Sequence, residues 1–82
     1  MRSYVLKIVL ENDQFEDGRP AFHAYCPSLP GARTWGHSKE EALKNIREVV
    51  QIVADELVEE GREIPRDGLI LEVESPAVVV TV

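Results

Sequence analysis

Cysteine and histidine are the residue types in this chain best suited to nucleophilic or metal chemistry. The single Cys26 follows His23 by three positions and precedes His37 by eleven. A nucleophilic thiol needs a neighbouring base, and a metal ion needs ligands at a suitable spacing. On an extended strand His23 and Cys26 point to opposite faces, and the three residues have no recognisable ligand spacing. We therefore expect a buried thiol at Cys26, and neither a catalytic cysteine nor a metal site.

Carboxylates offer a second kind of chemistry. A metal-dependent nuclease needs acidic residues that converge from neighbouring strands. Glu11 and Asp13 stand at the end of one expected strand, and Glu72 lies on a later one. A reduced nuclease that uses these three residues with a divalent metal stays an alternative hypothesis, although solvated carboxylates are the ordinary outcome. We expect no catalytic residue and no cofactor.

Three short strands are expected before one long helix. Residues 4–10 alternate and are rich in β-branched side chains, which is typical of a half-buried strand. A polar stretch follows, over residues 11–20, with the hairpin-turn dipeptide Asp17-Gly18. Residues 21–26 form the second strand and residues 32–36 the third. Between them, residues 27–31 contain two prolines and predict a turn.

The helix is expected over residues 39–60. Ser38 is a suitable N-cap, and Glu41 is placed to complete a capping box. Apolar residues then recur at spacings of three and four until Gly61 ends the helix and Pro65 prevents its continuation. Residues 69–74 alternate as a further strand. The apolar tail, residues 77–82, forms one more strand that pairs either within the chain or with a second copy.

These elements predict a single α+β domain over residues 1–82, with a three-stranded antiparallel sheet, one long helix and one or two C-terminal strands. One helix covers only one face of the sheet. The open face should carry Val5, Lys7, Val9 and the candidate partner-binding residues His23, Tyr25, Arg33, Trp35 and His37. Trp, Tyr and Arg are enriched at the energetic centres of protein interfaces, so we interpret this face as a binding surface or as a contact between two copies.

The charge distribution narrows the class of partner. Residues 1–54 are balanced, whereas residues 55–74 contain eight acidic and two basic side chains and account for the whole net charge of −6. Phosphate backbones select basic surfaces, so direct nucleic-acid binding is disfavoured and a basic protein is the better partner. The first apolar run is too short for a membrane span, and we expect a cytoplasmic protein.

The motif combination FHAYCPSLPGARTWGHSKEEALKNIREVV, followed by EEGREIP, resembles the HicB-type antitoxin family. The matching parts are an aromatic strand, a Pro-x-Leu-Pro-Gly turn, a Gly-x-Ser helix start, an acidic-Glu-Ala segment and a Gly-x-x-Ile-Pro end. In this chain they are Phe22, residues 27–31, residues 36–38, residues 40–42 and residues 61–65. The resemblance covers about residues 4–65. Ser28 and His37 stand where the family usually has acidic residues.

The resemblance implies a partial ribonuclease-H-like fold, in the order β-β-β-α-β, without that fold's catalytic carboxylates. It also implies a non-enzymatic antitoxin that neutralises a small basic mRNA-cleaving toxin of the HicA type. We expect a homo-oligomer, a dimer or a tetramer. Many HicB antitoxins continue into a DNA-binding domain, and this sequence has no such segment up to Val82, so no direct DNA binding is expected. An orphan structural module of the same fold remains the alternative.

Overall fold

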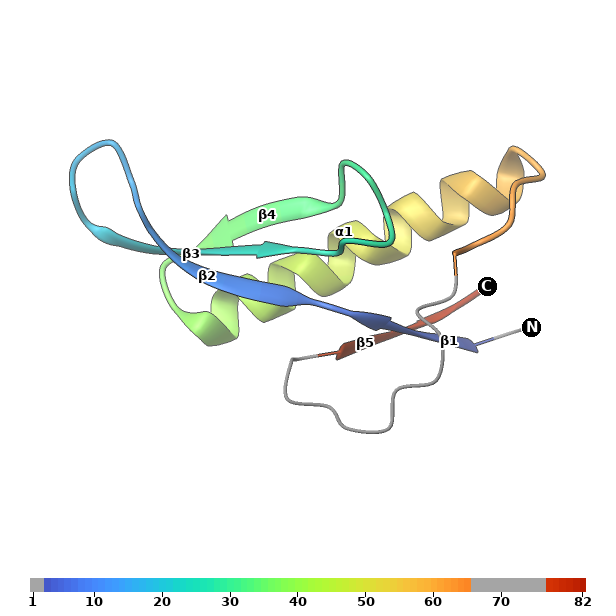
Figure 1. The fold of residues 1–82 in the computed structure, drawn as a ribbon, viewed down its shortest axis with the longest axis horizontal. Helices are drawn as coiled ribbons and strands as arrows, with labels where there is room; N and C mark the ends of the chain where they lie inside the picture. The colour runs from blue at the N-terminus through green and yellow to red at the C-terminus, as the bar shows by residue number, and fades with distance from the viewer. Residues whose placement is uncertain (1–2, 66–76) are drawn as a thin grey trace.

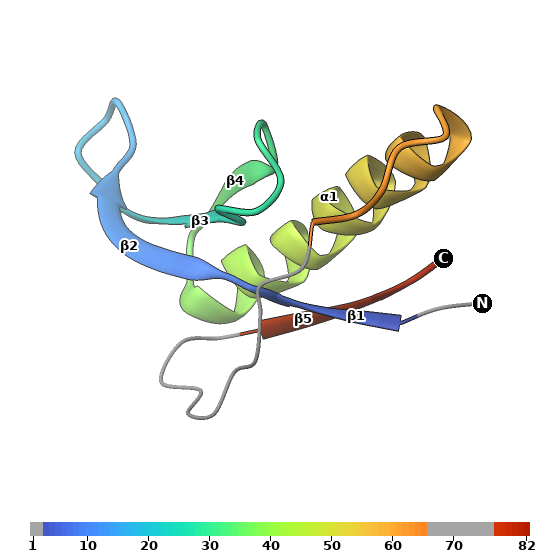
Figure 2. The same cartoon turned by 45° about the vertical axis from the view of Figure 1, so that its right-hand side comes forward.

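The computed structural model describes residues 3–65 and 77–82 and confirms the α+β class. Figures 1 and 2 show one long helix beside the strands, with the first and last strands of the chain side by side. The strand expected over residues 69–74 lies outside the described residues. The elements in chain order are β1 (Ser3–Lys7), β2 (Val9–Gln14), β3 (Pro20–Tyr25), β4 (Arg33–Gly36), α1 (Lys39–Glu59) and β5 (Ala77–Thr81).

Strands β2, β3 and β4 form an antiparallel sheet with β3 in the centre. The predicted hairpin turn joins β2 to β3. Gly18 adopts a φ of +83°, a conformation that glycine adopts without steric cost, and its N–H donates to the carbonyl of Phe15 over 2.9 Å. Asp17 accepts the backbone N–H of Arg19 over 3.0 Å, which is the usual way an aspartate closes a turn.

The first strand differs from the sequence prediction in two ways. The run expected as one strand over residues 4–10 is divided at Ile8, which is fully buried, because its first half pairs with β5 and its second half with β3. In addition, β2 continues through the polar residues up to Gln14, which the sequence assigned to the turn region. Cross-strand hydrogen bonds to β3 outweigh the weak strand propensity of these polar residues.

The tail forms β5, which pairs antiparallel with β1 of the same chain. Val78 and Val80 point into the core, whereas Val79 is exposed. The side-chain amide of Gln51 on α1 donates to the carbonyl of Thr81 over 3.0 Å and accepts its N–H over 3.5 Å. Helix α1 therefore holds the end of β5 through the Gln51 side chain, whose amide makes the two hydrogen bonds that a neighbouring strand would otherwise make.

The N-terminus of α1 is capped as predicted. The Ser38 hydroxyl accepts the backbone N–H of Glu41 over 3.0 Å. The Glu41 carboxylate reaches back one residue further than a capping box requires, and accepts the N–H of His37 over 3.2 Å. Two amide groups before and within the first turn are thereby satisfied by side chains.

The C-terminus of α1 is closed by Gly61, as predicted, with a φ of +71°. The N–H of Arg62 donates to the carbonyl of Leu57 over 2.8 Å, and the N–H of Gly61 donates to that of Val58 over 3.0 Å. This pair of bonds is the Schellman arrangement, in which a left-handed glycine turns the chain away from the helix axis.

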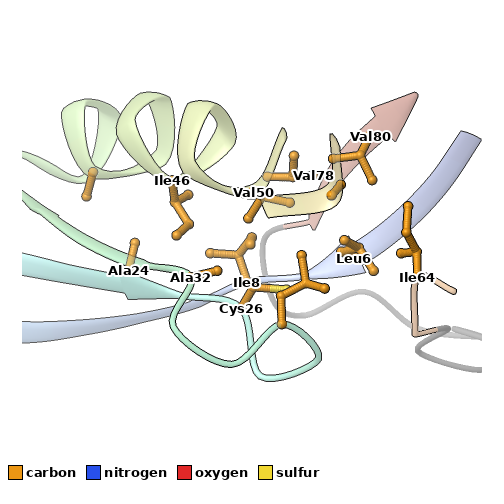
Figure 3. Close-up of a cluster of buried hydrophobic side chains, with 13 residues drawn as sticks. Leu6, Ile8, Ala24, Cys26, Ala32, Ile46, Val50, Ile64, Val78 and Val80 are labelled. Carbon is orange, nitrogen blue, oxygen red and sulfur yellow. The ribbon is translucent and has the colours of Figure 1, made fainter. Parts of the chain in front are cut away.

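The core lies between α1 and the strands (Figure 3). Cys26 is buried in it, as predicted, and Leu29 from the Pro-rich turn is 1% exposed. Gly36 meets the first turn of α1 so closely that an added Cβ would lie 2.5 Å from the backbone nitrogen of Ala42. The buried cluster consists of Leu6, Ile8, Ala24, Cys26, Leu29, Ala32, Ala42, Ile46, Val50, Ala54, Ile64, Val78 and Val80.

Candidate functional site

The candidate site is the face of the β2–β3–β4 sheet that α1 does not cover. Ala24 and Cys26 lie in the core against α1, so the alternating residues His23 and Tyr25 of β3 belong to the other face. Register places Glu11 of β2 and Trp35 of β4 on either side of His23. We call this surface, made of residues 9, 11, 13, 21, 23, 25, 33 and 35, the open face.

Three aromatic rings are stacked on the open face. The His23 ring lies 4.7 Å from the Trp35 ring, at an interplanar angle of 20°. The same imidazole also lies 5.2 Å from the Tyr25 ring, at an interplanar angle of 28°. Trp35 remains 42% exposed, which is high for an indole. The predicted candidates His23, Tyr25 and Trp35 are therefore brought together into one aromatic surface that is accessible to a partner.

The indole of Trp35 is held in place by Asp13. Its Nε1–H donates to Asp13 Oδ2 over 3.0 Å, and this bond passes over the central strand, because Asp13 lies on β2 and Trp35 on β4. Ala21, which pairs with Asp13 on β3, is only 1% exposed. The indole hydrogen bond, followed by the N–H of Gln14, holds the pKa of Asp13 below its ordinary value.

Glu11 is the second carboxylate of the open face. Its Oε2 lies 3.8 Å from Nδ1 of His23, and its side chain is 53% exposed. A hydrogen bond to Glu11, followed by burial, raises the pKa of the Tyr25 phenol. His23 Nε2 is buried and has no hydrogen-bond partner among the residues that the structure describes. A buried nitrogen without a partner costs folding free energy.

The remaining two candidates lie at the margins. Arg33 is exposed and pairs with Tyr25 in register, so it occupies one corner of the open face. His37 does not join the stack. Its ring lies 4.6 Å from that of Phe15, in the turn between β2 and β3. The sequence places His37 after the last strand residue, where strand alternation no longer determines the direction of a side chain.

Sequence reasoning did not include Glu11 and Asp13 in the open face. It considered them only as metal ligands, because it ended the first strand at residue 10. The alternation was visible, since Glu11 and Asp13 continue the row of Val9 by steps of two. Within the described ranges there is no cluster of three or more His, Cys, Asp or Glu suited to a metal ion, and Glu72 of the nuclease hypothesis lies outside them.

A smaller apolar surface lies on the β1–β5 pair. Val5 and Val79 are directly opposite each other and are 51% and 60% exposed. The acidic residues of the second half of α1 are also exposed. No helix in residues 3–65 and 77–82 combines the length and apolar composition that crossing a lipid bilayer requires.

Two sequence relatives are similar to this chain. A UPF0150 protein of Synechocystis sp. is 33% identical over 69 residues, which cover 84% of this chain and 82% of the relative. A UPF0150 protein of Thermoplasma acidophilum is 44% identical over 42 residues, which cover 51% of this chain and 61% of the relative. No family model matches the sequence.

Two solved structures share the fold. The N-terminal domain of the Burkholderia pseudomallei antitoxin HicB superimposes with a TM-score of 0.64 at 22% identity, and the match covers 95% of this chain and 96% of that one. The longer structure of the same antitoxin gives a TM-score of 0.61 at 20% identity. That match covers 100% of this chain and 64% of the longer one.

Proposed function

This chain belongs to the UPF0150 family and is HicB-like in fold, and we propose that it is an antitoxin-like protein-binding module. Its partner would be a small basic toxin of the HicA type that cleaves mRNA, which it would neutralise by binding. The chain would not itself be an enzyme. The observation that carries the proposal is the stack of Trp35, His23 and Tyr25 on a sheet face that no other described element covers.

Such a surface suits protein binding. Exposed aromatic residues held in place before contact lose little conformational freedom when a partner binds, so most of their contact energy is retained. Trp35 meets this condition because Asp13 holds its indole. Arg33 adds a second residue type that is common at interface centres.

Charge supports a basic partner. Eight of the fifteen acidic residues lie within residues 55–74, and those that the structure describes are exposed. Opposite charges on two proteins accelerate their encounter and exclude partners of the same sign. The same acidic surface repels phosphate backbones, which agrees with binding the toxin rather than its RNA substrate.

Self-association is part of the proposal. The exposed pair Val5 and Val79 offers an apolar contact for a second copy on the β1–β5 surface, away from the aromatic stack. A dimer or tetramer could therefore present more than one open face. An oligomer without any toxin partner is the alternative function, and the experiment below separates the two.

The test is co-expression with the product of the adjacent gene, followed by mass measurement of the purified complex and a ribonuclease assay. We expect a stable complex in which the ribonuclease activity is suppressed. Trp35→Ala should weaken the association by more than ~1 kcal/mol and leave the fold intact. A homo-oligomer that ignores the neighbouring protein, or a Trp35→Ala variant with unchanged affinity and unchanged oligomer mass, would refute the proposal.

A further inference from the structure

The open face has two chemically different ends. Along β2, Glu11 and Asp13 lie two residues apart on the same face, next to His23 and Trp35. The other end is a row of paired residues across the three strands, Val9, Tyr25 and Arg33, in which Arg33 is the one charged side chain. Asp13 therefore contacts the most exposed aromatic ring of the face, that of Trp35, and Glu11 contacts the His23 ring stacked on it. Arg33, the single arginine of the face, lies two residues from Trp35 on β4 and at the corner opposite Asp13.

An arginine side chain fits the acidic end better than other groups do. Its planar guanidinium can lie flat on an aromatic ring. Its N–H groups, which point outward in the guanidinium plane, can then donate to a carboxylate beside the ring. A carboxylate has about four acceptor positions. Asp13 accepts two hydrogen bonds, from Trp35 and from the backbone of Gln14, so acceptor positions remain on it, and Glu11 is half exposed.

His23 connects the Glu11 carboxylate to the aromatic surface. Its Nδ1 lies 3.8 Å from Glu11 Oε2, and its ring is stacked on that of Trp35. Because β2 and β3 are adjacent here, a guanidinium on these rings also lies close to the Glu11 carboxylate.

Nucleobases are the main competitor for an aromatic sheet face. Proteins that bind single strands stack bases on such rings, but they surround them with Lys and Arg that contact the phosphates. Here the open face carries one basic residue, Arg33, and the side chain bonded to the Trp35 indole is the acidic Asp13. Phosphates would be repelled at the place where the bases would stack.

We propose that Glu11, Asp13 and the Trp35–His23–Tyr25 stack form a site that binds an arginine side chain of a partner protein. The proposal rests on the proposed function, since it specifies the chemistry by which a basic partner is recognised. Glu11 supplies charge at the site, Trp35 supplies the stacking surface, and Asp13 positions the indole.

Trp35 is the only tryptophan of the chain, so its fluorescence and its indole N–H resonance report directly on this site. The probes are a hexa-arginine peptide, a hexa-lysine peptide and a hexauridine oligonucleotide. We expect hexa-arginine to quench Trp35 and shift its indole resonance, and to bind at least about fivefold more tightly than hexa-lysine. Hexauridine should leave both signals unchanged.

Glu11→Gln should weaken hexa-arginine binding by about fivefold to tenfold, because it removes one charge-assisted hydrogen bond and preserves the shape of the side chain. Glu48→Gln is the matched control. It removes the same charge from an exposed position of α1, on the side of the helix away from the sheet, and should change binding by less than about twofold. Equal weakening in both variants, tighter binding of hexauridine, or equal affinity for the two peptides would overturn the proposal.

The toxin complex distinguishes this inference from the proposed function. If the neighbouring gene product binds wild-type protein and Glu11→Gln equally well, the antitoxin function stands and the arginine site is refuted. If hexa-arginine binds with the expected pattern and the gene product does not bind, the site stands and the choice of toxin is refuted.

Discussion

The contact between β4 and the first turn of α1 leads to a sharp prediction at Gly36. A Cβ added there would lie 2.5 Å from the nitrogen and 2.9 Å from the Cα of Ala42, and 3.0 Å from the carbonyl carbon of Glu41. All three are backbone atoms, so no side-chain rotation can relieve the clash. Gly36→Ala must move the helix start away from the sheet.

The magnitude follows from the distances. Non-bonded carbon atoms rest about 3.5–4.0 Å apart, so the helix start must move by about 1 Å. Overpacking of this kind costs about 1–3 kcal/mol. Because the clash is with backbone atoms, which cannot rotate away, we expect a cost near the upper end of this range. Gly36 is not among the glycines with positive φ, so alanine can adopt its backbone conformation. Alanine also lowers the conformational entropy of the unfolded chain, which stabilises the folded state by about 0.4–1 kcal/mol. We expect a net loss of about 2 kcal/mol in the free energy of unfolding.

Urea denaturation and thermal melting measure this loss. About 2 kcal/mol corresponds to a fall in Tm of roughly 8–16 °C for a domain of this size. Gly61→Ala is the control, because a Cβ there has no atom within 4 Å and the substitution strains only a backbone with φ of +71°. It should cost about 1 kcal/mol and perturb amide resonances at the C-terminal end of α1.

Gly36→Ala should instead perturb the amide of Ala42, which donates to the carbonyl of Ser38 over 2.9 Å. The close approach of β4 and α1 would be refuted if Gly36→Ala were as stable as the wild-type protein. It would also be refuted if the shifts around Ala42 were unchanged.

Three further predictions concern hydrogen bonds made by individual side chains. The indole of Trp35 lowers the pKa of Asp13, so the hydrogen bond between them should be fully formed above the ordinary aspartate pKa of 3.8. It should weaken only as the pH falls through the lower pKa of Asp13 in the folded protein. A titration of the indole N–H resonance with its midpoint at or above pH 3.8 would contradict this prediction. Gln51→Ala should increase amide hydrogen exchange at Thr81, measured by NMR, more than at the amides of β3, and uniform change in both strands would argue against the Gln51 contact. Ser38→Ala should cost about 1 kcal/mol in urea denaturation, Ser38→Asp should restore most of it, and an alanine variant of unchanged stability would show that the cap contributes nothing.

Local signals were sufficient for the helix, the turns and one sheet face. Ser38 and Gly61 set the helix ends through hydrogen bonds to residues within five positions, and Gly18 closes the hairpin in the same way. Alternation along β3 separated His23 and Tyr25 from Cys26 because the side-chain period of a strand is two. The motif combination that these local structures share with HicB antitoxins led to the fold that the comparisons found.

The composition of the open face needed the tertiary structure. Glu11 and Asp13 join it because β3 extends β2 by hydrogen bonds through polar residues that have weak strand propensity of their own. His37 is not part of the aromatic stack: its ring meets Phe15, which the hairpin brings close from 22 residues earlier in the sequence.

The sequence by itself determined where the helix begins and ends, where the chain turns, and which side of the first two expected strands faces the core, since these depend on interactions between near neighbours along the chain. Only the tertiary structure decided that the first strand divides at Ile8 and that the tail pairs with β1 of the same chain. It also decided that Asp13 reaches across β3 to hold Trp35. Strand pairing joins residues far apart in sequence, and its partners are chosen by the burial and hydrogen bonding of the whole chain, which no short pattern contains.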